Sequence, residues 1–187
     1  MTYVKEIFGI ARAWPSITLA GTFISYFLSG NIEFFMLLIA LMVNDGINYF
    51  LKYYIAKPMM GSKKWPILGY GTRPKGAKYC SLYVMPNSNG EPKGSYGMPS
   101  GHAQNSVFFS TYLILNLMSG NFNNLTKITG TIIFSIIAIG IMYSRVYFKC
   151  HTFEQVIMGG AIGGILAALF YKNKDRLKKK IFRYIFH

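Results

Sequence analysis

Acidic residues are scarce in this chain. Only 6 of its 187 residues are Asp or Glu, against 20 Lys and Arg, so the formal net charge is +14. The carboxylates are isolated from one another, as Glu33 and Asp45 illustrate, and no cluster of them exists that could bind Mg²⁺. We therefore expect neither a metal ion nor another cofactor.

Cysteine is scarcer still, with Cys80 and Cys150 as the chain's two examples. Two cysteines are too few for a scaffold stapled by disulfides, and their spacing matches no metal-ligand pattern. The sequence favours unpaired thiols over a disulfide. It leaves the redox compartment open.

Apolar residues, by contrast, are abundant. They make up 52% of the chain, and 17% of all residues are aromatic. The basic residues are interleaved with long apolar segments rather than gathered in a polar, basic-faced domain, so we expect no nucleic-acid partner. This combination indicates a basic membrane protein.

Spanning a bilayer takes roughly 20 mostly apolar residues in a helix, and five segments come close to that length. They are 14–30, 32–56, 103–119, 126–149 and 152–171. Because backbone groups in lipid must be bonded within the segment, helices are expected here. The predicted fold class is all-α, an integral-membrane bundle of about five helices, with a short interfacial helix at 1–13.

The sequence divides into one membrane-embedded domain, 1–171, and a basic amphipathic tail, 172–187. A long loop at about 57–97 interrupts the domain and holds most of the prolines. A loop of that length inside a compact protein is either functional or disordered. We expect the tail to lie on anionic lipid on the cytoplasmic side, with the functional loop on the other side.

Three polar constellations stand at helix ends, and the alternation of helices places all three on one side of the membrane. The first joins Lys52 with Arg73-Pro74. The second is Pro99-Ser100-Gly101-His102, and the third is the segment "SRVYFKCHTFEQV", which runs from Ser144 to Val156. Their shared side predicts one site.

These motifs resemble the type-2 phosphatidic acid phosphatase superfamily, whose pattern is K-x6-R-P, P-S-G-H and S-R-x5-H-x3-D. The second motif is complete, and Arg145 is followed after five residues by His151. The run H-T-x-x-Q-V looks most like the dolichyl diphosphatase branch. The resemblance covers roughly residues 45–165. It implies that His151 attacks phosphorus to form a phosphohistidine while His102 protonates the leaving oxygen.

Two departures from the superfamily pattern leave alternatives open. Met59 stands where the arginine after Lys52 should be, so either the loop carries an insertion before Arg73 or Lys64 replaces Lys52 as its partner. Gln155 stands in place of the aspartate. At i+4 from His151 it can still accept a hydrogen bond from the imidazole, and Glu154 at i+3 is the alternative.

The residues support phosphate chemistry without the family. Lys52, Arg73 and Arg145 supply positive charge, and the N–H groups of Ser100, Gly101 and His102 begin a helix whose dipole favours an anion. Lys64 and Ser144 complete the candidate phosphate-binding set. Histidine suits both proton transfer and attack, because its pKa lies near neutrality.

The predicted function is hydrolysis of a polyprenyl or dolichyl diphosphate, or of a related lipid phosphate, in the endoplasmic reticulum or plasma membrane. Its partners would be that lipid substrate and the bilayer. A non-hydrolytic lipid-phosphate binding protein and a lipid phosphotransferase are the alternatives. The glycines at 159, 160, 163 and 164 are interpreted as sites of close helix packing.

Overall fold

The structure is a computed structural model that describes residues 2–78, 80–82 and 95–185. Most of this part of the chain is helical, as predicted. The elements are α1 Thr2–Ser29, α2 Ile32–Phe50, the π-helix η1 Leu51–Ala56, α3 Lys57–Met60, β1 Lys64–Trp65, β2 Gly69–Tyr70, α4 Gly101–Ser119, α5 Asn124–Tyr147 and α6 Phe153–Ile185.

Three segments are long and apolar enough to cross a membrane: Ile32–Met60, Asn124–Tyr147 and Phe153–Lys180. Length and composition thus support three of the five predicted spans. The first of these continues from α2 through η1 and α3 without a break. The predicted loop at 57–97 consequently begins at Gly61 rather than at Lys57.

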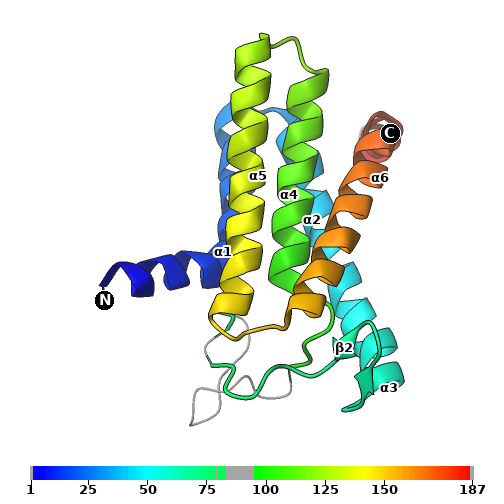
Figure 1. Cartoon of the computed structure of the whole chain (residues 1–187). Coiled ribbons are helices and arrows are strands. Elements are labelled where there is room, and N and C mark those ends of the chain that lie inside the picture. Colours follow the sequence, from blue (N-terminus) through cyan, green and yellow to red (C-terminus); the bar gives the residue numbers. More distant parts are fainter. Residues whose placement is uncertain (1, 79, 83–94, 186–187) are drawn as a thin grey trace.

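Helix α4 is less apolar than these three segments. It lies inside the bundle, where its polar side chains find partners on other helices. It contacts α6, α5, α2 and α1, which surround it in Figure 1. Polar side chains of α4 bond to these neighbours instead of facing lipid. Gln104 accepts from Asn48 Nδ2 at 2.8 Å and donates to the Asn44 carbonyl at 2.9 Å. A polar inner helix is tolerated because its buried amides are hydrogen-bonded.

Glycines of α6 allow this helix to approach the backbone of α4. A Cβ on Gly159 would collide with the Ser100 carbonyl oxygen, and one on Gly163 would collide with the Gln104 carbonyl oxygen. A Cβ on Gly164 would make only an ordinary contact with Val107. The interpretation as sites of close helix packing is confirmed for Gly159 and Gly163. Their close approach fixes the N-terminus of α6 beside the N-terminus of α4.

Helix α1 combines the predicted interfacial helix and the first predicted span. Its N-terminal part projects sideways from the bundle, and the rest runs along the bundle (Figure 1). The helix contains Pro15, which lacks an N–H donor and clashes with the preceding turn, so a bend is expected. Thr18 Oγ1 donates to the Pro15 carbonyl at 3.0 Å.

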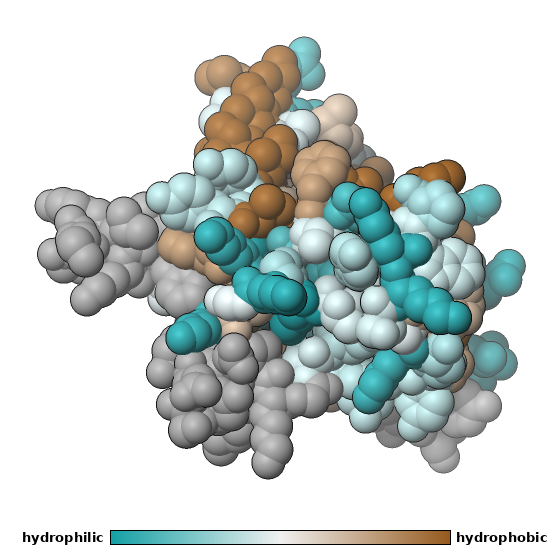
Figure 2. Space-filling view, turned by 60° about the horizontal axis from the view of Figure 1, so that its bottom comes forward, coloured by the Kyte–Doolittle hydropathy of each residue, from teal (hydrophilic) through white to brown (hydrophobic). Residues whose placement is uncertain are grey.

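The end of the bundle at the bottom of Figure 1 carries the ends of α2, α4, α5 and α6 that bear the predicted motifs. The loop between α3 and α4 lies there too, and its residues 79 and 83–94 fall outside the described part of the chain. Figure 2 looks onto this end, where hydrophilic side chains gather while hydrophobic ones cover the helices.

The predicted tail is continuous with the last predicted span. Both belong to α6, which carries the chain from this end of the bundle to the opposite one (Figure 1). There Lys174 and Lys178 pair with Glu33 of α2, at 3.7 and 3.1 Å. These ion pairs join the first turn of α2 to the far part of α6.

Candidate active site

A cavity of about 250 Å³ opens at this end of the bundle. It is bordered by α1, α2, η1, the long loop, the start of α4 and the turn between α5 and α6. Its lining includes Asp45, Asn48, Lys52, Arg73, Gly101, His102 and His151. One cavity thus brings together residues from all three predicted constellations.

His151 is buried at the wall of this cavity, with 3% of its surface exposed. Its Nδ1 lies 2.9 Å from Gln155 Oε1, and its Nε2 lies 3.0 Å from Arg73 Nη1. A guanidinium only donates, so Nε2 is the acceptor and Nδ1 carries the proton. This is the tautomer that a nucleophilic Nε2 requires.

Gln155 is fully buried, and its amide orientation is fixed by the loop. Its Nε2 donates to the carbonyl of Tyr70 at 2.8 Å and to that of Thr72 at 2.7 Å. The remaining oxygen therefore faces His151. The predicted i+4 hydrogen bond is present, and the same amide also anchors the loop segment that leads into Arg73.

Arg73 reaches the cavity from the loop despite its displacement from the superfamily position. Its Nε and Nη2 both donate to Ser95 Oγ, at 3.0 and 2.9 Å, and its Nη1 donates to the Cys150 carbonyl at 2.8 Å. The residues between α3 and Arg73 form the β1–β2 hairpin, in which Lys64 pairs with Tyr70 and Trp65 with Gly69. This hairpin occupies the place of the expected insertion.

Lys52, rather than Lys64, accompanies Arg73 in the cavity. Lys52 lies in η1 and is buried, whereas Lys64 lies in β1, exposed to solvent and outside the cavity lining. π-Helical turns often occur at functional sites. The prediction of Lys64 as a phosphate ligand thus finds no support in its position, because its side chain projects from the hairpin.

The N-terminus of α4 borders the cavity with fewer free donors than expected. Ser100 caps the helix by accepting from Ala103 N at 3.5 Å, and its own N–H donates to the Gln155 carbonyl at 3.0 Å. The N–H of Ser100 is therefore committed to protein. The N–H groups of Gly101 and His102, in the first turn, lack intrahelical acceptors and can face an anion.

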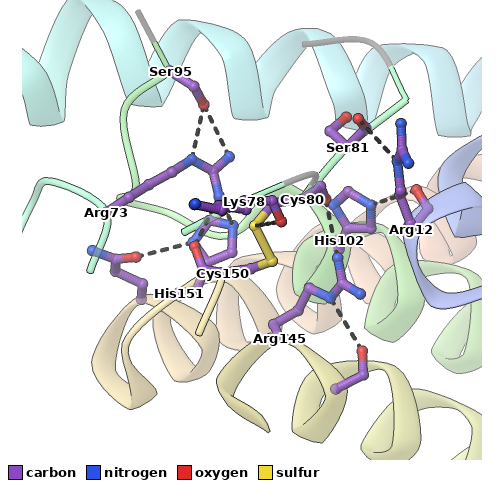
Figure 3. The surroundings of a disulfide bond; sticks show 12 residues. Arg12, Arg73, Lys78, Cys80, Ser81, Ser95, His102, Arg145, Cys150 and His151 are labelled. Carbon is purple, nitrogen blue, oxygen red and sulfur yellow. Dashed lines mark hydrogen bonds between the residues drawn. A yellow bond between two sulfur atoms is a disulfide. The ribbon is translucent and has the colours of Figure 1, made fainter. Parts of the chain in front are cut away.

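His102 is held by helix α1. Its Nε2 lies 3.0 Å from the Arg12 carbonyl, to which it donates (Figure 3). The other ring nitrogen, Nδ1, is then the one available to a group in the cavity. No sequence motif indicated that α1 contributes to this site.

Arg145 is fully buried behind the cavity. Its Nε donates to Ser144 Oγ at 3.1 Å and its Nη1 to the Cys80 carbonyl at 3.1 Å, while Nη2 has no partner among the described residues. The Ser144 hydroxyl itself donates to the Ile141 carbonyl at 2.6 Å. Ser144 therefore orients Arg145 instead of presenting its own hydroxyl to the cavity as predicted.

Cys80 and Cys150 form a disulfide, so the expectation of unpaired thiols was wrong (Figure 3). Their Cα atoms are 5.5 Å apart although 70 residues separate them in the sequence. The error arose because proximity across such a separation depends on where the loop folds. The bond joins the long loop to the turn that precedes His151.

Burial and positive charge control the protonation of this site. The pKa of His151 lies well below its ordinary value of 6.5, first because the ring is buried and then because Arg73 and Lys52 are close. Burial also lowers the pKa of Arg73 to about 10, against the opposing effect of Tyr53. His151 is consequently neutral at physiological pH, while Arg73 stays charged.

Several residues of the site carried no motif. Ser95 holds Arg73, Arg12 holds His102, and Asn48 lines the cavity one turn before Lys52. The spacing of Asn48 and Lys52 on one helix face is a signal that the sequence does contain. Ser95 and Arg12 come from loop and helix segments whose approach depends on the tertiary fold.

These features describe a multi-pass membrane protein with a cationic, histidine-containing site of the kind that accommodates phosphoryl groups. The PAP2 superfamily profile matches residues 33–179, and the chain belongs to that superfamily. The resemblance seen in the motifs is thereby confirmed.

The similar proteins include phosphatases of lipid diphosphates. Dolichyldiphosphatase 1 of Homo sapiens is 29% identical over 140 residues, which cover 70% of this chain and 48% of that protein. Dolichyldiphosphatase of Saccharomyces cerevisiae is 32% identical over 81 residues, 42% of this chain and 34% of that protein. Lipid phosphate phosphatase gamma of Arabidopsis thaliana is 38% identical over 80 residues, 41% of this chain and 35% of that protein.

The chain spans about half the length of the dolichyldiphosphatase 1 relatives it matches. No solved structure matches it significantly.

Proposed function

We propose that the protein is a membrane phosphatase that hydrolyses a lipid diphosphate, of the polyprenyl or dolichyl class, through a phosphohistidine on His151. The observation that carries this proposal is the hydrogen-bonding of His151. Gln155 Oε1 accepts the hydrogen bond from the protonated Nδ1. The unprotonated Nε2 lies at the cavity and accepts from Arg73 Nη1. A neutral, oriented imidazole next to a phosphate-binding cation is what nucleophilic attack on phosphorus needs.

In the first step, Arg73 Nη1 turns its donor from His151 to the bound phosphoryl group. The freed Nε2 lone pair of His151 then forms a bond to phosphorus as the bond to the leaving oxygen breaks. His102 keeps its Nε2 proton on the Arg12 carbonyl and takes up a second proton on Nδ1 in the complex with the anionic substrate; it delivers this Nδ1 proton to the leaving oxygen. In the second step, His102 takes a proton from water, which attacks phosphorus and releases His151 with free phosphate. Arg73, Lys52, and the N–H groups of Gly101 and His102 stabilise the charge on the phosphoryl oxygens in both steps.

We further propose that α1 and α4 complete a set of five membrane-crossing helices. Each runs beside a helix that is long and apolar enough to span, and α4 is enclosed by the others (Figure 1). The cavity would then sit at one membrane surface. A lipid headgroup could enter it while the chain of the lipid stays in the bilayer.

The proposal is tested with purified protein and a panel of lipid phosphates without added metal. We expect release of phosphate from a polyprenyl diphosphate, and a base-stable, acid-labile phosphoryl adduct that is absent from His151→Ala. Full activity of His151→Ala would rule out the nucleophile. Binding of the lipid without phosphate release by the wild type would indicate a binding protein, and transfer of the phosphoryl group to an added alcohol would indicate a phosphotransferase.

A further inference from the structure

The two cysteines do more than join two segments, because each of them bonds an arginine of the site through its backbone. The Cys80 carbonyl accepts from Arg145 Nη1 at 3.1 Å, and the Cys150 carbonyl accepts from Arg73 Nη1 at 2.8 Å. Figure 3 shows the disulfide between these two guanidinium groups. A single covalent link thus connects the acceptors of both arginines.

The two cysteines differ in how firmly the rest of the protein holds them. Cys80 belongs to the long loop and lies outside any helix or strand, whereas Cys150 follows α5 and donates its N–H to the Arg145 carbonyl at 2.9 Å. Both cysteines are buried, in a small cluster with Ala77 and Phe148. The position of the Cys80 carbonyl therefore depends strongly on its bond to the better-anchored Cys150.

Arg145 retains one donor atom that the described part of the protein does not use. Arg145 Nη2 is buried and has no partner among the described residues. An unpaired buried donor is costly unless a ligand satisfies it, and a phosphoryl oxygen is an acceptor of the right kind. Its direction is set by the bonds of Nε and Nη1, and the second of these ends on Cys80.

We infer that the Cys80–Cys150 disulfide is a positioning element of the phosphate site, which holds the guanidinium groups of Arg73 and Arg145 in place through its own carbonyl oxygens. The inference rests on the proposed function for the identity of the ligand. An external dithiol reduces the S–S bond by supplying two electrons and two protons. Cys80 and Cys150 become thiols, and the dithiol is oxidised to a cyclic disulfide. The Cys80 carbonyl is then free to move, and the two arginines lose their fixed spacing.

A double-mutant cycle in the full chain tests this inference, with inorganic phosphate as the probe in calorimetric titration. We expect the Cys80→Ser/Cys150→Ser variant to bind phosphate about tenfold more weakly than the wild type, within the usual range of coupling between contacting groups. In an Arg145→Gln background, which lacks the guanidinium that bonds the Cys80 carbonyl, the same pair of substitutions should change affinity far less. Phe148→Leu, which loosens the same cluster and keeps the disulfide, is the matched control and should bind as the wild type does.

An equal loss of affinity in both backgrounds would overturn the inference, since the disulfide would then stabilise the fold without acting through Arg145. Unchanged affinity of the serine variant would overturn it as well. If the serine variant fails to fold, the folded wild type is treated stepwise with dithiothreitol, and free thiols are counted with a maleimide. The inference requires phosphate affinity to fall in step with the number of thiols, and two reactive thiols before reduction would contradict it.

These results are separable from the proposed function. A wild type that binds phosphate through the disulfide-held arginines, but hydrolyses no lipid phosphate, would contradict the proposed function alone. A wild type that hydrolyses the lipid equally well with and without the disulfide would contradict the positioning role alone.

Discussion

At the scale of single residues, the imidazole of His151 is fixed by partners on both ring nitrogens. Gln155 accepts from Nδ1 and Arg73 donates to Nε2. The superfamily pattern has an aspartate where this chain has Gln155, and the structure shows what the amide adds. A carboxylate could accept from His151, but it could not donate to the carbonyls of Tyr70 and Thr72.

Substitutions of Gln155 separate these two contributions. Gln155→Leu removes the hydrogen bonds of the amide to His151, Thr152, Tyr70 and Thr72, and we expect kcat to fall by about 10²-fold, the scale of a lost catalytic hydrogen bond. Gln155→Glu keeps the acceptor for His151 but places a carboxylate oxygen against two carbonyls, so we expect a partial loss of kcat. The acidic limb of the pH–rate profile of Gln155→Glu should lie at higher pH than that of the wild type, because a nearby negative charge raises the pKa of His151. Steady-state pH–rate profiles measure both effects, and a leucine variant with wild-type kcat would reduce Gln155 to a packing residue.

The pH dependence of the free enzyme follows from the lowered pKa of His151. The neutral ring is the reactive form, so kcat/KM should stay high through pH 6.5 and fall only as the pH drops through that lowered pKa. Arg73→Gln removes one cause of the lowering and should shift the acidic limb to higher pH, besides reducing kcat/KM. Arg183→Gln, an exposed arginine at the far end of α6, is the control and should leave the profile unchanged. An unshifted limb in Arg73→Gln would show that Arg73 does not act on His151.

At the scale of elements, the contact between α4 and α6 aligns the site. The N-terminus of α4 supplies Gly101 and His102, and Gln155 of α6 bonds the N–H of Ser100 through its carbonyl. This alignment depends on Gly159 and Gly163, where backbone packs on backbone. Interior packing of this density does not absorb an added methyl group without displacement.

We expect Gly163→Ala to destabilise the protein by about 1–3 kcal/mol, the usual cost of overpacking, and to lower activity as well. The reason is that the new Cβ would meet the Gln104 carbonyl oxygen, which is backbone and cannot rotate away. Gly140→Ala in α5 is the control, because a Cβ there meets nothing within 4 Å. Thermal unfolding in detergent compares the two. Equal melting temperatures would contradict a role for Gly163 in holding α6 against α4.

At the scale of the whole molecule, the disulfide and the basic tail give consistent indications of membrane orientation. Disulfides persist in oxidising compartments, and the Cys80–Cys150 bond lies at the end that carries the site. Helix α6 leads from that end to the opposite one, where its lysine-rich part lies (Figure 1). Cytoplasmic segments are enriched in Lys and Arg.

We therefore predict that the site faces the lumen or the outside and that the C-terminus is cytoplasmic. An N-glycosylation acceptor segment inserted at the exposed Lys63, in the turn before β1, should be modified in a eukaryotic expression host. The same segment appended after His187 should stay unmodified. A mobility shift sensitive to glycosidase reports each outcome. Modification of the C-terminal acceptor alone would show the opposite orientation, with the site on the cytoplasmic side.

The sequence by itself determined the helical fold class, the family and several of the residues that line the cavity. Apolar runs report burial in lipid directly, and the motifs P-S-G-H and S-R-x5-H are local, so His102, Arg145 and His151 could be found by spacing alone. Even the bond between His151 and Gln155 follows from helical periodicity, because i and i+4 share a face.

Only the tertiary structure decided which distant residues meet. Lys52 lines the cavity and Lys64 does not, and Cys80 is bonded to Cys150. The Ser144 hydroxyl donates to the Ile141 carbonyl, and the Ser100 N–H donates to the Gln155 carbonyl. The physical reason is common to all four. A helix fixes neighbours within one or two turns, whereas the position of a loop residue results from many weak contacts distributed along the chain, which no local pattern records.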